Sequence, residues 1–393
     1  MRPREILYIS YDGILEPLGR SQVLSYLLKL SSTHNICLIS YEKKENLDKE
    51  ELLFSAREIC REHNIKWKYF RYHKKPQNLA TLYDVLKGMS YSFYLSIRRK
   101  VEIIHVRSDI AGLISFPSLV VFNKILIFDM RGFWADEKAD RAGWRRDSFI
   151  YIFFKSLETK LLMISKGIIT LTKDAISILI KENPSLEKEK FHVIRTCVDQ
   201  DAFYYSKKRK NTGTLNIAHL GAVDTAYDIE PVVALVKNLS VLREVKIHFL
   251  NQDRHQFIED YCIKYELPPD TFHIRSIQRE EISDYLQKIH LGCFYAKKNF
   301  SIKASMPTKI GEFLSCGVPI LCNNVNTDIF ELISENSVGL VLDEFNDSIN
   351  KINEDITELI QRDGIQEDCS LISRKYFNLE EGSNKLNRIY DTV

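Results

Sequence analysis

Short apolar runs alternate with longer amphipathic stretches through the first half of the chain. The short runs cover residues 5–10, 36–40, 65–70, 103–106, 125–128, 167–171 and 191–194. The longer stretches, in which apolar residues recur every three or four positions, cover residues 19–30, 47–62, 79–98, 148–164 and 174–181, and a further helix is expected after Asp109. Short apolar runs are typical of buried strands, and the longer period is typical of helices. Their alternation predicts a parallel sheet covered by helices on both faces.

The same pattern restarts at residue 216. Predicted strands cover residues 216–220, 245–250, 272–274, 291–295, 318–321 and 338–342. Predicted helices cover residues 230–239, 254–265, 282–288, 310–315, 349–362 and 379–390. The halves resemble each other in architecture and not in residues. The predicted fold class is therefore α/β, with two doubly wound, Rossmann-like parallel-sheet domains facing a cleft.

A polar segment that lacks periodicity, residues 201–216, separates the two halves and includes the basic run KKRK at 207–210. Such a segment is typical of a linker between domains. We expect an N-terminal domain at residues 1–203, a linker at 204–215 and a C-terminal domain at 216–375. We expect residues 376–393 to form a helix that packs back on the N-terminal domain.

The bulk composition restricts the class of protein. Of 393 residues, 45% are hydrophobic and 27% are charged, which is typical of a soluble globular protein. The net charge of +2 gives no reason to expect nucleic acid as a partner. The eight cysteines lack a Cys-x-x-Cys pair, so we expect buried free thiols in a reducing compartment.

The chain also lacks a signal peptide and any uncharged span near the ~20 residues of a membrane helix. We therefore expect a cytoplasmic protein. Basic clusters at residues 98–100, 145–146 and 207–210 are compatible with a solvated surface or with a peripheral contact to anionic lipid at the inner face of the plasma membrane.

The most informative stretch is residues 301–321, SIKASMPTKIGEFLSCGVPIL. A loop with hydroxyl and ammonium groups, including Lys303, Ser305 and Lys309, leads into a short helix. Unpaired N–H groups at a helix N-terminus point at any ligand placed there, which makes this loop a natural anion site. Glu312, just inside the helix, can accept hydrogen bonds from a sugar diol. The alternative is a solvated loop before an ordinary helix.

Two further polar segments follow predicted strands. Asp12-Gly13 and Gly19-Arg20-Ser21-Gln22 follow residues 5–10, and the run DMRGFWADE at 129–137 follows residues 125–128. Ligands of doubly wound sheets bind at the carboxyl ends of the strands. Arg131 can hold an anionic oxygen bidentately, and Trp134 can cover an apolar sugar face. The alternatives are a tight turn at Gly19 and a core position for Trp134.

Several other classes of site are disfavoured. The chain lacks a Gly-x-Gly-x-x-Gly fingerprint and a phosphate loop, so we do not expect a nicotinamide, flavin or nucleotide-triphosphatase site. Asp136 and Glu137 are adjacent and point in different directions on regular structure, which excludes a glycosidase pair read from them. Asp199-x-Asp201 is interpreted as a hinge turn rather than a metal site. His105 is interpreted as a core histidine.

Taken together, these motifs resemble glycosyltransferases of the GT-B fold, specifically the large retaining, family 4-like group that builds bacterial polysaccharides. The resemblance depends on SYDG at 10–13, PLGRSQ at 17–22, FDMRGFW at 128–134, TCVD at 196–199 before Phe203, HLG at 219–221 and above all residues 305–319. It implies a hexosyl- or pentosyltransferase that moves a sugar from a nucleotide-diphosphate donor to a saccharide or lipid-linked acceptor. Capsule or O-antigen synthesis is the implied setting, with no metal and no other cofactor.

The resemblance also implies roles for individual residues. Catalytic roles fall to Arg131, Lys309 and Glu312. Donor binding falls to Gly221, Lys303, Ser305, Met306, Pro307, Thr308, Lys309 and Glu312. Acceptor binding falls to Asp12, Gly19, Arg20, Ser21, Gln22, Arg131, Trp134 and Glu137.

The sequence departs from the group's pattern at two places. The group carries two acids separated by seven residues; Glu312 matches the second, and Ala304 stands where the first is expected. The group also carries an Arg and a Lys after the first strand of the second domain, whereas residues 221–226 here contain neither. Lys303 and Lys309 are the expected substitutes in binding the diphosphate.

Three alternatives stay open. The first is a nucleotide-sugar 2-epimerase on the same architecture. The second is a non-catalytic, sugar-nucleotide-binding partner of a transferase, suggested by Ala304. The third, within the transferase reading, is a phosphoribosyl pyrophosphate donor, suggested by the absent basic pair.

Overall fold

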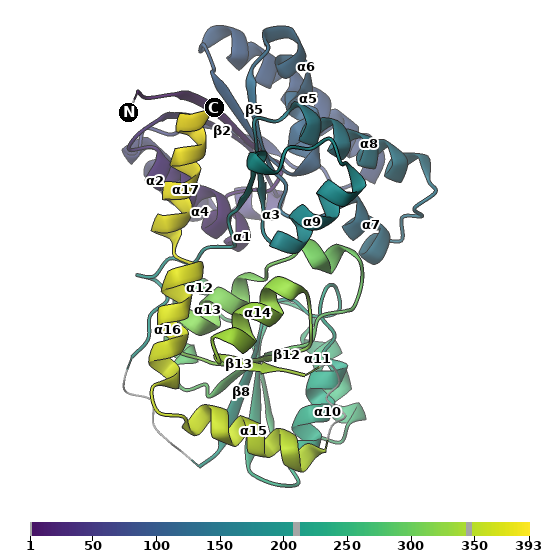
Figure 1. Cartoon of the computed structure of the whole chain (residues 1–393), viewed down its shortest axis with the longest axis vertical. Coiled ribbons are helices and arrows are strands. Elements are labelled where there is room, and N and C mark those ends of the chain that lie inside the picture. The colour runs from purple at the N-terminus through teal and green to yellow at the C-terminus, as the bar shows by residue number, and fades with distance from the viewer. Residues whose placement is uncertain (1, 207–212, 343–347) are drawn as a thin grey trace. The chain divides into compact units, whose positions relative to one another are not determined.

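A computed structural model describes residues 2–206, 213–342 and 348–393 (Figure 1). The expected basic run at 207–210 lies outside the described residues. By its internal contacts the chain divides into two compact units. The first unit comprises Met1–Arg195 with Leu379–Val393, and the second comprises Thr196–Asn378.

The first unit is built on a parallel sheet with the strand order β3-β2-β1-β4-β5-β6-β7. Its strands are β1 (Glu5–Ser10), β2 (Asn35–Glu42), β3 (Lys66–Arg71), β4 (Ile103–Arg107), β5 (Ile125–Asp129), β6 (Gly167–Thr170) and β7 (Phe191–Val193). The strand order reverses between β1 and β4. The helices are α1 (Pro17–Gly19), a π-helix (Arg20–Leu24), α2 (Ser25–Leu30), α3 (Lys44–Leu47), α4 (Glu50–Glu62), α5 (Gln77–Arg98), α6 (Ser108–Phe122), α7 (Trp134–Ala142), α8 (Phe149–Ile164), α9 (Lys173–Glu182), a 3-10 turn (Lys188–Lys190) and α17 (Leu379–Thr392).

The second unit repeats this architecture with a parallel sheet in the order β10-β9-β8-β11-β12-β13, which reverses between β8 and β11. Its strands are β8 (Leu215–Leu220), β9 (Val245–Leu250), β10 (Phe272–Arg275), β11 (Leu291–Phe294), β12 (Ile320–Cys322) and β13 (Gly339–Val341). The helices are α10 (Glu230–Leu239), α11 (His255–Lys264), α12 (Arg279–Leu286), a 3-10 turn (Ser301–Ala304), α13 (Thr308–Ser315), α14 (Thr327–Glu335), α15 (Ile349–Gln361) and α16 (Ile365–Tyr376).

The predicted fold class, two doubly wound α/β sheets, is confirmed. Helices α7, α14 and α16 were not predicted, and neither was the short helix α3. Residues 134–137 were assigned to a polar loop, and this assignment is wrong because they open α7. The sequence of α7, WADEKADRA, is mostly polar and buries only Ala135 and Asp136, so it shows no apolar stripe.

The division between the units differs from the expected boundaries of 203 and 204–215. Residues 196–206 group with the second unit. The Val198 N–H donates to the Phe377 carbonyl at 2.7 Å, and the Thr196 hydroxyl donates to the Met306 carbonyl at 2.9 Å. The backbone N–H of Tyr204 donates to the Ser283 hydroxyl at 3.2 Å. These bonds join residues 196–204 to the helices and loops of the second unit well before residue 216.

Helix α17 belongs to the first unit, where its buried face meets β4 and α2. The Tyr390 hydroxyl lies 2.7 Å from Nδ1 of His105, and both residues are fully buried. The Thr33 hydroxyl lies 3.1 Å from Oδ1 of Asn387. His105 is therefore a core histidine with a hydrogen-bonded ring, and it stacks on Tyr8 with the ring centroids 4.3 Å apart.

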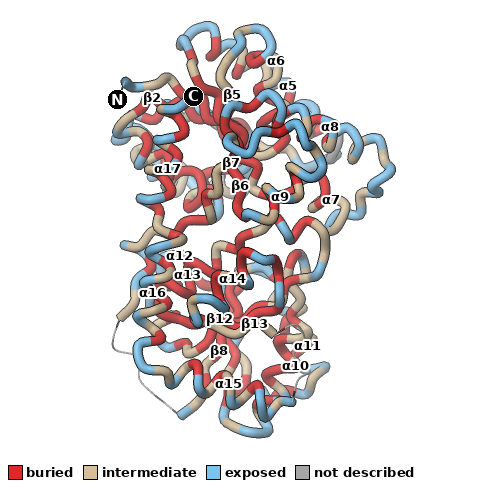
Figure 2. Tube along the Cα trace, viewed as in Figure 1, coloured by how far each residue is buried: buried red, intermediate tan, exposed pale blue. Residues whose placement is uncertain are grey.

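Each sheet lies inside its unit and the helices provide the exposed surface, as the distribution of buried residues shows (Figure 2). All eight cysteines are buried. Among the described residues, no helix is long and apolar enough to cross a membrane. Burial of both sheets leaves their strand ends and the following loops as the places where polar groups gather.

Replacing Tyr390 by Phe tests the anchoring of α17. The change leaves buried Nδ1 of His105 without its hydroxyl partner, which costs about 1–2 kcal/mol of stability. For a unit of this size we expect the unfolding midpoint to fall by about 2–8 °C in calorimetry. Tyr83→Phe on the exposed face of α5 is the matched control and should leave the midpoint unchanged. Equal midpoints for the Tyr390 variant and wild type would contradict the anchoring role.

Candidate functional site

In the second unit, the loop that leads into α13 is held in place by hydrogen bonds. The Asn326 side-chain amide donates to the carbonyls of Ile302 (3.2 Å) and Ser305 (2.9 Å), and its Oδ1 accepts from the N–H of Ile329 at the start of α14. The Thr196 hydroxyl fixes the Met306 carbonyl. Pro307 precedes the first turn of α13 and no side chain caps that turn. The loop is therefore fixed, and the first N–H groups of α13 lack a capping side chain.

Lys309, in the first turn of α13, is a buried cation. Its side chain is 5% exposed, and its Nζ lies 3.7 Å from the ring centroid of Tyr227 and 5.6 Å from that of Phe294. Among the described residues, this Nζ has no hydrogen-bond partner. Burial lowers the pKa of Lys309 to about 7, although Glu312 and Cys293 nearby act to raise it. Burying an ammonium group without a hydrogen bond is unfavourable, and a bound anion would offset that cost.

The ring of Tyr227 is placed by strand-like pairing with the segment that follows β11. The Asp228 N–H donates to the Tyr295 carbonyl at 2.9 Å, and Tyr227 bridges to Ala296. His219 lies edge-on to Tyr227, with the ring centroids 6.3 Å apart. Its ring nitrogens are 3.2 Å from the Cys293 carbonyl and 3.4 Å from the Ala222 carbonyl. Burial and the nearby Lys309 charge lower the pKa of His219 to about 3, so the imidazole is neutral at neutral pH.

Glu312 lies one helical turn after Lys309 and is also buried. Its Oε1 accepts a hydrogen bond of 3.0 Å from Nη1 of Arg279, the first residue of α12. The Arg279 guanidinium in turn lies over the ring of Phe203, 4.9 Å from its centroid. Sequence reasoning missed Arg279, because a single arginine at the start of a polar helix carries no motif.

Gly221 forms an open turn at the carboxyl end of β8. It has φ of +84°, and apart from its two chain neighbours no described residue has an atom within 4 Å of the position a Cβ would take. The Asn251 amide donates to its carbonyl at 2.7 Å. Nearby, Arg254 and Lys297 approach the Asp224 carboxylate at 3.6 and 3.7 Å. Sequence reasoning missed both cations, and their position after the strand ends of β9 and β11 is the one signal that could have found them.

The remaining donor candidates surround the start of α13 unevenly. Met306 and Pro307 are buried, and Thr308 is half-buried. The Ser305 hydroxyl donates to the Ser301 carbonyl. Lys303 is exposed, with its Nζ 5.6 Å from the Phe300 ring centroid. The structure therefore brings Lys309 and Glu312 into one buried cluster, and it leaves Lys303 on the surface.

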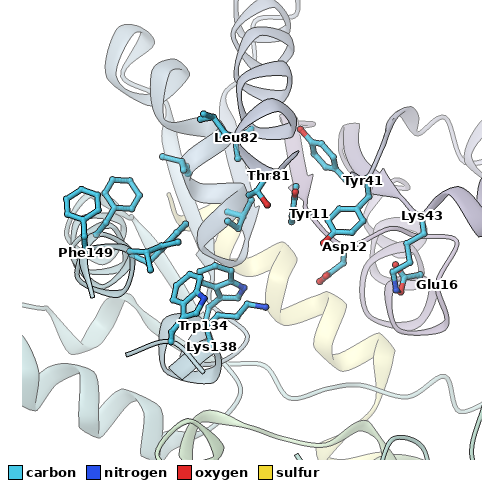
Figure 3. Close-up of a pocket in the computed structure, with 18 residues that line it drawn as sticks. Tyr11, Asp12, Glu16, Tyr41, Lys43, Thr81, Leu82, Trp134, Lys138 and Phe149 are labelled. Carbon is cyan, nitrogen blue, oxygen red and sulfur yellow. The ribbon is translucent and has the colours of Figure 1, made fainter. Parts of the chain in front are cut away.

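The first unit contains a pocket of about 740 Å³ at the carboxyl ends of β1, β2, β3 and β5 (Figure 3). Its lining is predominantly apolar and aromatic. The lining residues are Tyr11, Asp12, Glu16, Tyr41, Lys43, Tyr72, Thr81, Leu82, Val85, Ile110, Leu113, Trp134, Lys138, Trp144, Phe149, Ile150, Phe153 and Phe154. Of the predicted acceptor residues, Asp12 and Trp134 line this pocket. Gly19, Arg20, Ser21, Gln22, Arg131 and Glu137 are not among the lining residues.

The turn that carries Asp12 is held by a buried carboxylate. The oxygens of Glu42 accept from the N–H groups of Ile14 (2.9 Å) and Leu15 (3.1 Å). Burial raises the pKa of Glu42. Gly19 closes the same turn, since a Cβ on it would lie 1.9 Å from the Gly13 carbonyl oxygen. Gly19 is therefore required for close packing of the turn.

Arg131 lies in a buried charged cluster. Its Nε donates to Asp129 at 2.8 Å, and Nη1 of Arg107 lies 3.5 Å from the same carboxylate. Burial acts to raise the pKa of Asp129, but Arg131, His105 and Arg107 hold it well below its usual range. Arg107 also lies 3.7 Å from Asp12, so the cluster reaches the pocket across the β1–β4 switch point. Sequence reasoning missed Arg107.

The two adjacent acids of α7 have separate environments. Asp136 accepts from the Tyr151 hydroxyl at 2.7 Å and from Nζ of Lys155 at 3.2 Å, which joins α7 to α8. Glu137 pairs with Arg141 at 3.7 Å, and burial raises the pKa of Glu137. The prediction that these acids point in different directions is confirmed.

The described residues contain no cluster of His, Cys, Asp or Glu that could hold a metal ion.

Comparison with known proteins adds a family and a set of structural relatives. Residues 202–376 match the model of the family described as glycosyl transferases group 1. No curated protein sequence matches the chain.

Solved structures match over the full length at low identity. Sucrose-phosphate synthase from Thermosynechococcus elongatus is 13% identical with a TM-score of 0.75, covering 100% of this chain and 99% of that chain. HepE from Anabaena, solved with UDP and glucose, is 11% identical with a TM-score of 0.70, covering 99% and 100%. WaaG, a glycosyltransferase involved in lipopolysaccharide biosynthesis, is 13% identical with a TM-score of 0.67, covering 98% and 99%. The chain thus has the two Rossmann-like units of the GT-B fold, and the match at 202–376 supports a glycosyltransferase.

Lys309→Met tests the buried ammonium without any assumption about activity. The pKa of Lys309 is about 7 in the folded chain, whereas an unperturbed lysine has a pKa of 10.5. Between these pH values the unfolded chain holds a proton that the folded chain does not, so stability rises with pH. We expect the unfolding midpoint of wild type to rise from pH 7 to pH 9.5 more steeply than that of Lys309→Met. The variant should also be the more stable protein at pH 7, because an apolar side chain replaces a desolvated charge.

Lys303→Met is the matched control for this experiment, since it removes an exposed lysine of the same segment. It should retain the pH dependence of wild type. A Lys309→Met profile parallel to that of wild type would contradict the lowered pKa.

Proposed function

We propose that the protein is a glycosyltransferase that moves a sugar from a nucleotide-diphosphate donor, bound by the second unit, to a saccharide or lipid-linked acceptor, bound by the first. The observation that carries this proposal is the buried Nζ of Lys309 at the uncapped start of α13, inside the segment that matches the family model. A desolvated cation beside first-turn N–H groups that no described side chain caps suits a leaving diphosphate.

The diphosphate, the ribose and the sugar of the donor are each assigned to groups of the second unit. The diphosphate lies at Lys309 and at the backbone N–H groups of Met306 and Thr308, since the Ser305 N–H donates to the Ile302 carbonyl and Pro307 has no N–H. The ribose hydroxyls donate to Glu312, whose carboxylate Arg279 holds in place. The open turn at Gly221 gives the sugar room to approach the backbone. Arg254 and Lys297 follow strand ends and provide further positive charge, so we propose that no metal is required.

The structural relatives support the donor class and the setting. HepE was solved with UDP and glucose, and WaaG takes part in lipopolysaccharide biosynthesis. By analogy we propose a UDP-sugar or related donor and a role in a bacterial surface polysaccharide such as capsule or O-antigen. We also propose a retaining outcome and a location in the cytoplasm at the inner face of the plasma membrane.

In the first unit, we propose that Asp12 and Trp134 contact the acceptor at the mouth of the pocket. Arg131 pairs with Asp129 in the charged cluster that reaches Asp12 through Arg107. We therefore propose that Arg131 acts by fixing the charge around the reaction centre, because an arginine cannot shuttle protons at neutral pH. Gly19 packs against Gly13, the residue after Asp12, and so helps to fix the turn that carries Asp12.

A second candidate function is a nucleotide-sugar 2-epimerase. A protein of Listeria monocytogenes assigned as a UDP-N-acetylglucosamine 2-epimerase shares the architecture at 13% identity with a TM-score of 0.62, covering 100% of this chain and 97% of that chain. Incubating the protein with UDP-N-acetylglucosamine alone separates the two functions. A new epimer formed without an acceptor would establish the epimerase, whereas a transferase leaves the sugar configuration of the donor unchanged.

Glu312→Ala tests the donor site. A ligand that binds the folded state stabilises it by mass action, by about 2.7 kcal/mol at a hundredfold excess over Kd, and so raises the unfolding midpoint. We expect one member of a panel of UDP, GDP, CDP and phosphoribosyl pyrophosphate to raise the midpoint of wild type. The same ligand should give little or no rise in Glu312→Ala, because its ribose hydroxyls lose their acceptor.

Two further variants make this test specific. Glu312→Gln keeps the shape of the side chain and should recover part of the rise. Glu354→Ala removes an exposed acid of α15 and should behave as wild type. Equal nucleotide-induced rises in Glu312→Ala and wild type would refute the role of Glu312 in donor binding.

A further inference from the structure

The pocket of the first unit has two ends of different chemistry. One end is formed by side chains of α5, α6 and α8, and the other by the segments that follow β1, β2 and β3. Figure 3 shows Phe149 on one side and Asp12, Glu16 and Lys43 on the opposite side, with Trp134 and Lys138 between them in this view. A ligand that fills the pocket therefore meets an apolar wall at one end and charged groups at the other.

The polar end is ordered by its own contacts. The Tyr11 hydroxyl donates to Asp84 at 3.3 Å, and Nζ of Lys43 pairs with Glu16 at 2.6 Å. Asp12 is different, because its side chain is 61% exposed and its contact with Arg107 is 3.7 Å long. Asp12 is thus the carboxylate at this end that is placed to accept a hydrogen bond from a ligand hydroxyl.

The apolar end offers almost no hydrogen bonds to a ligand. Its side chains are hydrocarbon, and Thr81 provides the one hydroxyl among them. They are Leu82, Val85, Ile110, Leu113, Phe149, Ile150, Phe153 and Phe154. A sugar placed there would lose the water bound to its hydroxyls without replacement, which is unfavourable. A hydrocarbon chain has no such groups and gains from every methylene buried.

The apolar wall continues onto the exposed surface. Phe149 is 85% exposed and Leu82 is 53% exposed, although both line the pocket. Leu79 and Leu86, one helical turn from Leu82 on the same face of α5, are also exposed. Large exposed apolar residues next to a pocket mark a binding site rather than ordinary surface. They form an apolar route by which a chain longer than the pocket can leave it.

We propose that this pocket binds the hydrocarbon chain of the acceptor, so that the acceptor is an amphiphile with its head group at Asp12. The chain lies against α5, α6 and α8, and the hydroxyl that receives the sugar lies at the carboxyl end of β1. This assignment rests on the proposed transferase function and narrows its acceptor from a saccharide or lipid to a lipid.

The protein offers an intrinsic probe for the test. Of its three tryptophans, Trp134 and Trp144 line the pocket, and the third, Trp67, belongs to β3. We expect n-alkyl glucosides with four to eight carbons, used below their micelle concentrations, to change the tryptophan fluorescence saturably. Affinity should rise about fourfold for each added methylene, the value for full burial of a methylene group. Free glucose should give no saturable change.

Neighbouring residues of α8 provide matched variants. Phe153 lines the pocket, whereas Ile152 is 55% exposed and does not line it. Phe153→Asn should weaken octyl glucoside binding about tenfold or more, since it removes a large apolar contact. Ile152→Asn should bind as wild type does. Both positions are partly exposed, so both variants should fold, and their unfolding midpoints check this.

Three results would overturn the proposal. The first is an affinity that does not depend on chain length. The second is an equal fluorescence change with free glucose, which would identify a saccharide site. The third is an equal loss in Ile152→Asn and Phe153→Asn, which would identify a membrane-adsorbing face instead of a pocket. If alkyl glucosides bind as expected but no nucleotide stabilises the protein, the transferase function fails while the chain-binding pocket stands.

Discussion

The second unit is organised around one buried charge, the ammonium group of Lys309. The fold places the Lys309 ammonium against the faces of Tyr227 and Phe294, where it has no hydrogen bond from the described residues. Such an arrangement is unfavourable in the empty protein, and its cost is reduced as soon as an anion arrives. The surrounding structure serves this arrangement. His219 stays neutral next to Tyr227, Asn326 fixes the loop that leads into α13, and the sheet order reverses between β8 and β11.

The first unit follows the same topological rule with different chemistry. Its sheet reverses between β1 and β4, and the charged groups Asp12, Arg107 and Asp129 meet at that point. Next to these groups the first unit has an apolar pocket, whereas the second unit has a buried cation near its own reversal point. The two units thus provide one site suited to a diphosphate and one suited to an amphiphilic ligand, on sheets of the same design.

Much of the fold could be predicted from the sequence, because the spacing of apolar residues and the length of each apolar run are local properties of the chain. The strands at residues 5–10 and 245–250 and the helix at 230–239 appear within the predicted bounds. Lys309 and Glu312 could be found because a helix start is a local signal. Arg279, Tyr227 and Arg107 could not, because tertiary pairing brings them to their sites from distant strands and helices. Lys303 shows the converse: it is close to Lys309 in sequence, but it lies on the surface and not in the buried cluster. The cleft expected between the domains stays a prediction.

The most direct test of the account is a proton count on donor binding. Isothermal titration of the nucleotide identified in the panel, at pH 8 in two buffers of different ionisation enthalpy, measures the protons exchanged. At this pH a lysine with a pKa of about 7 is mostly neutral, and a diphosphate beside it favours the charged form. The account predicts uptake approaching one proton per nucleotide in wild type and none in Lys309→Met. Binding without proton uptake in wild type would contradict the claim that Lys309 receives the diphosphate.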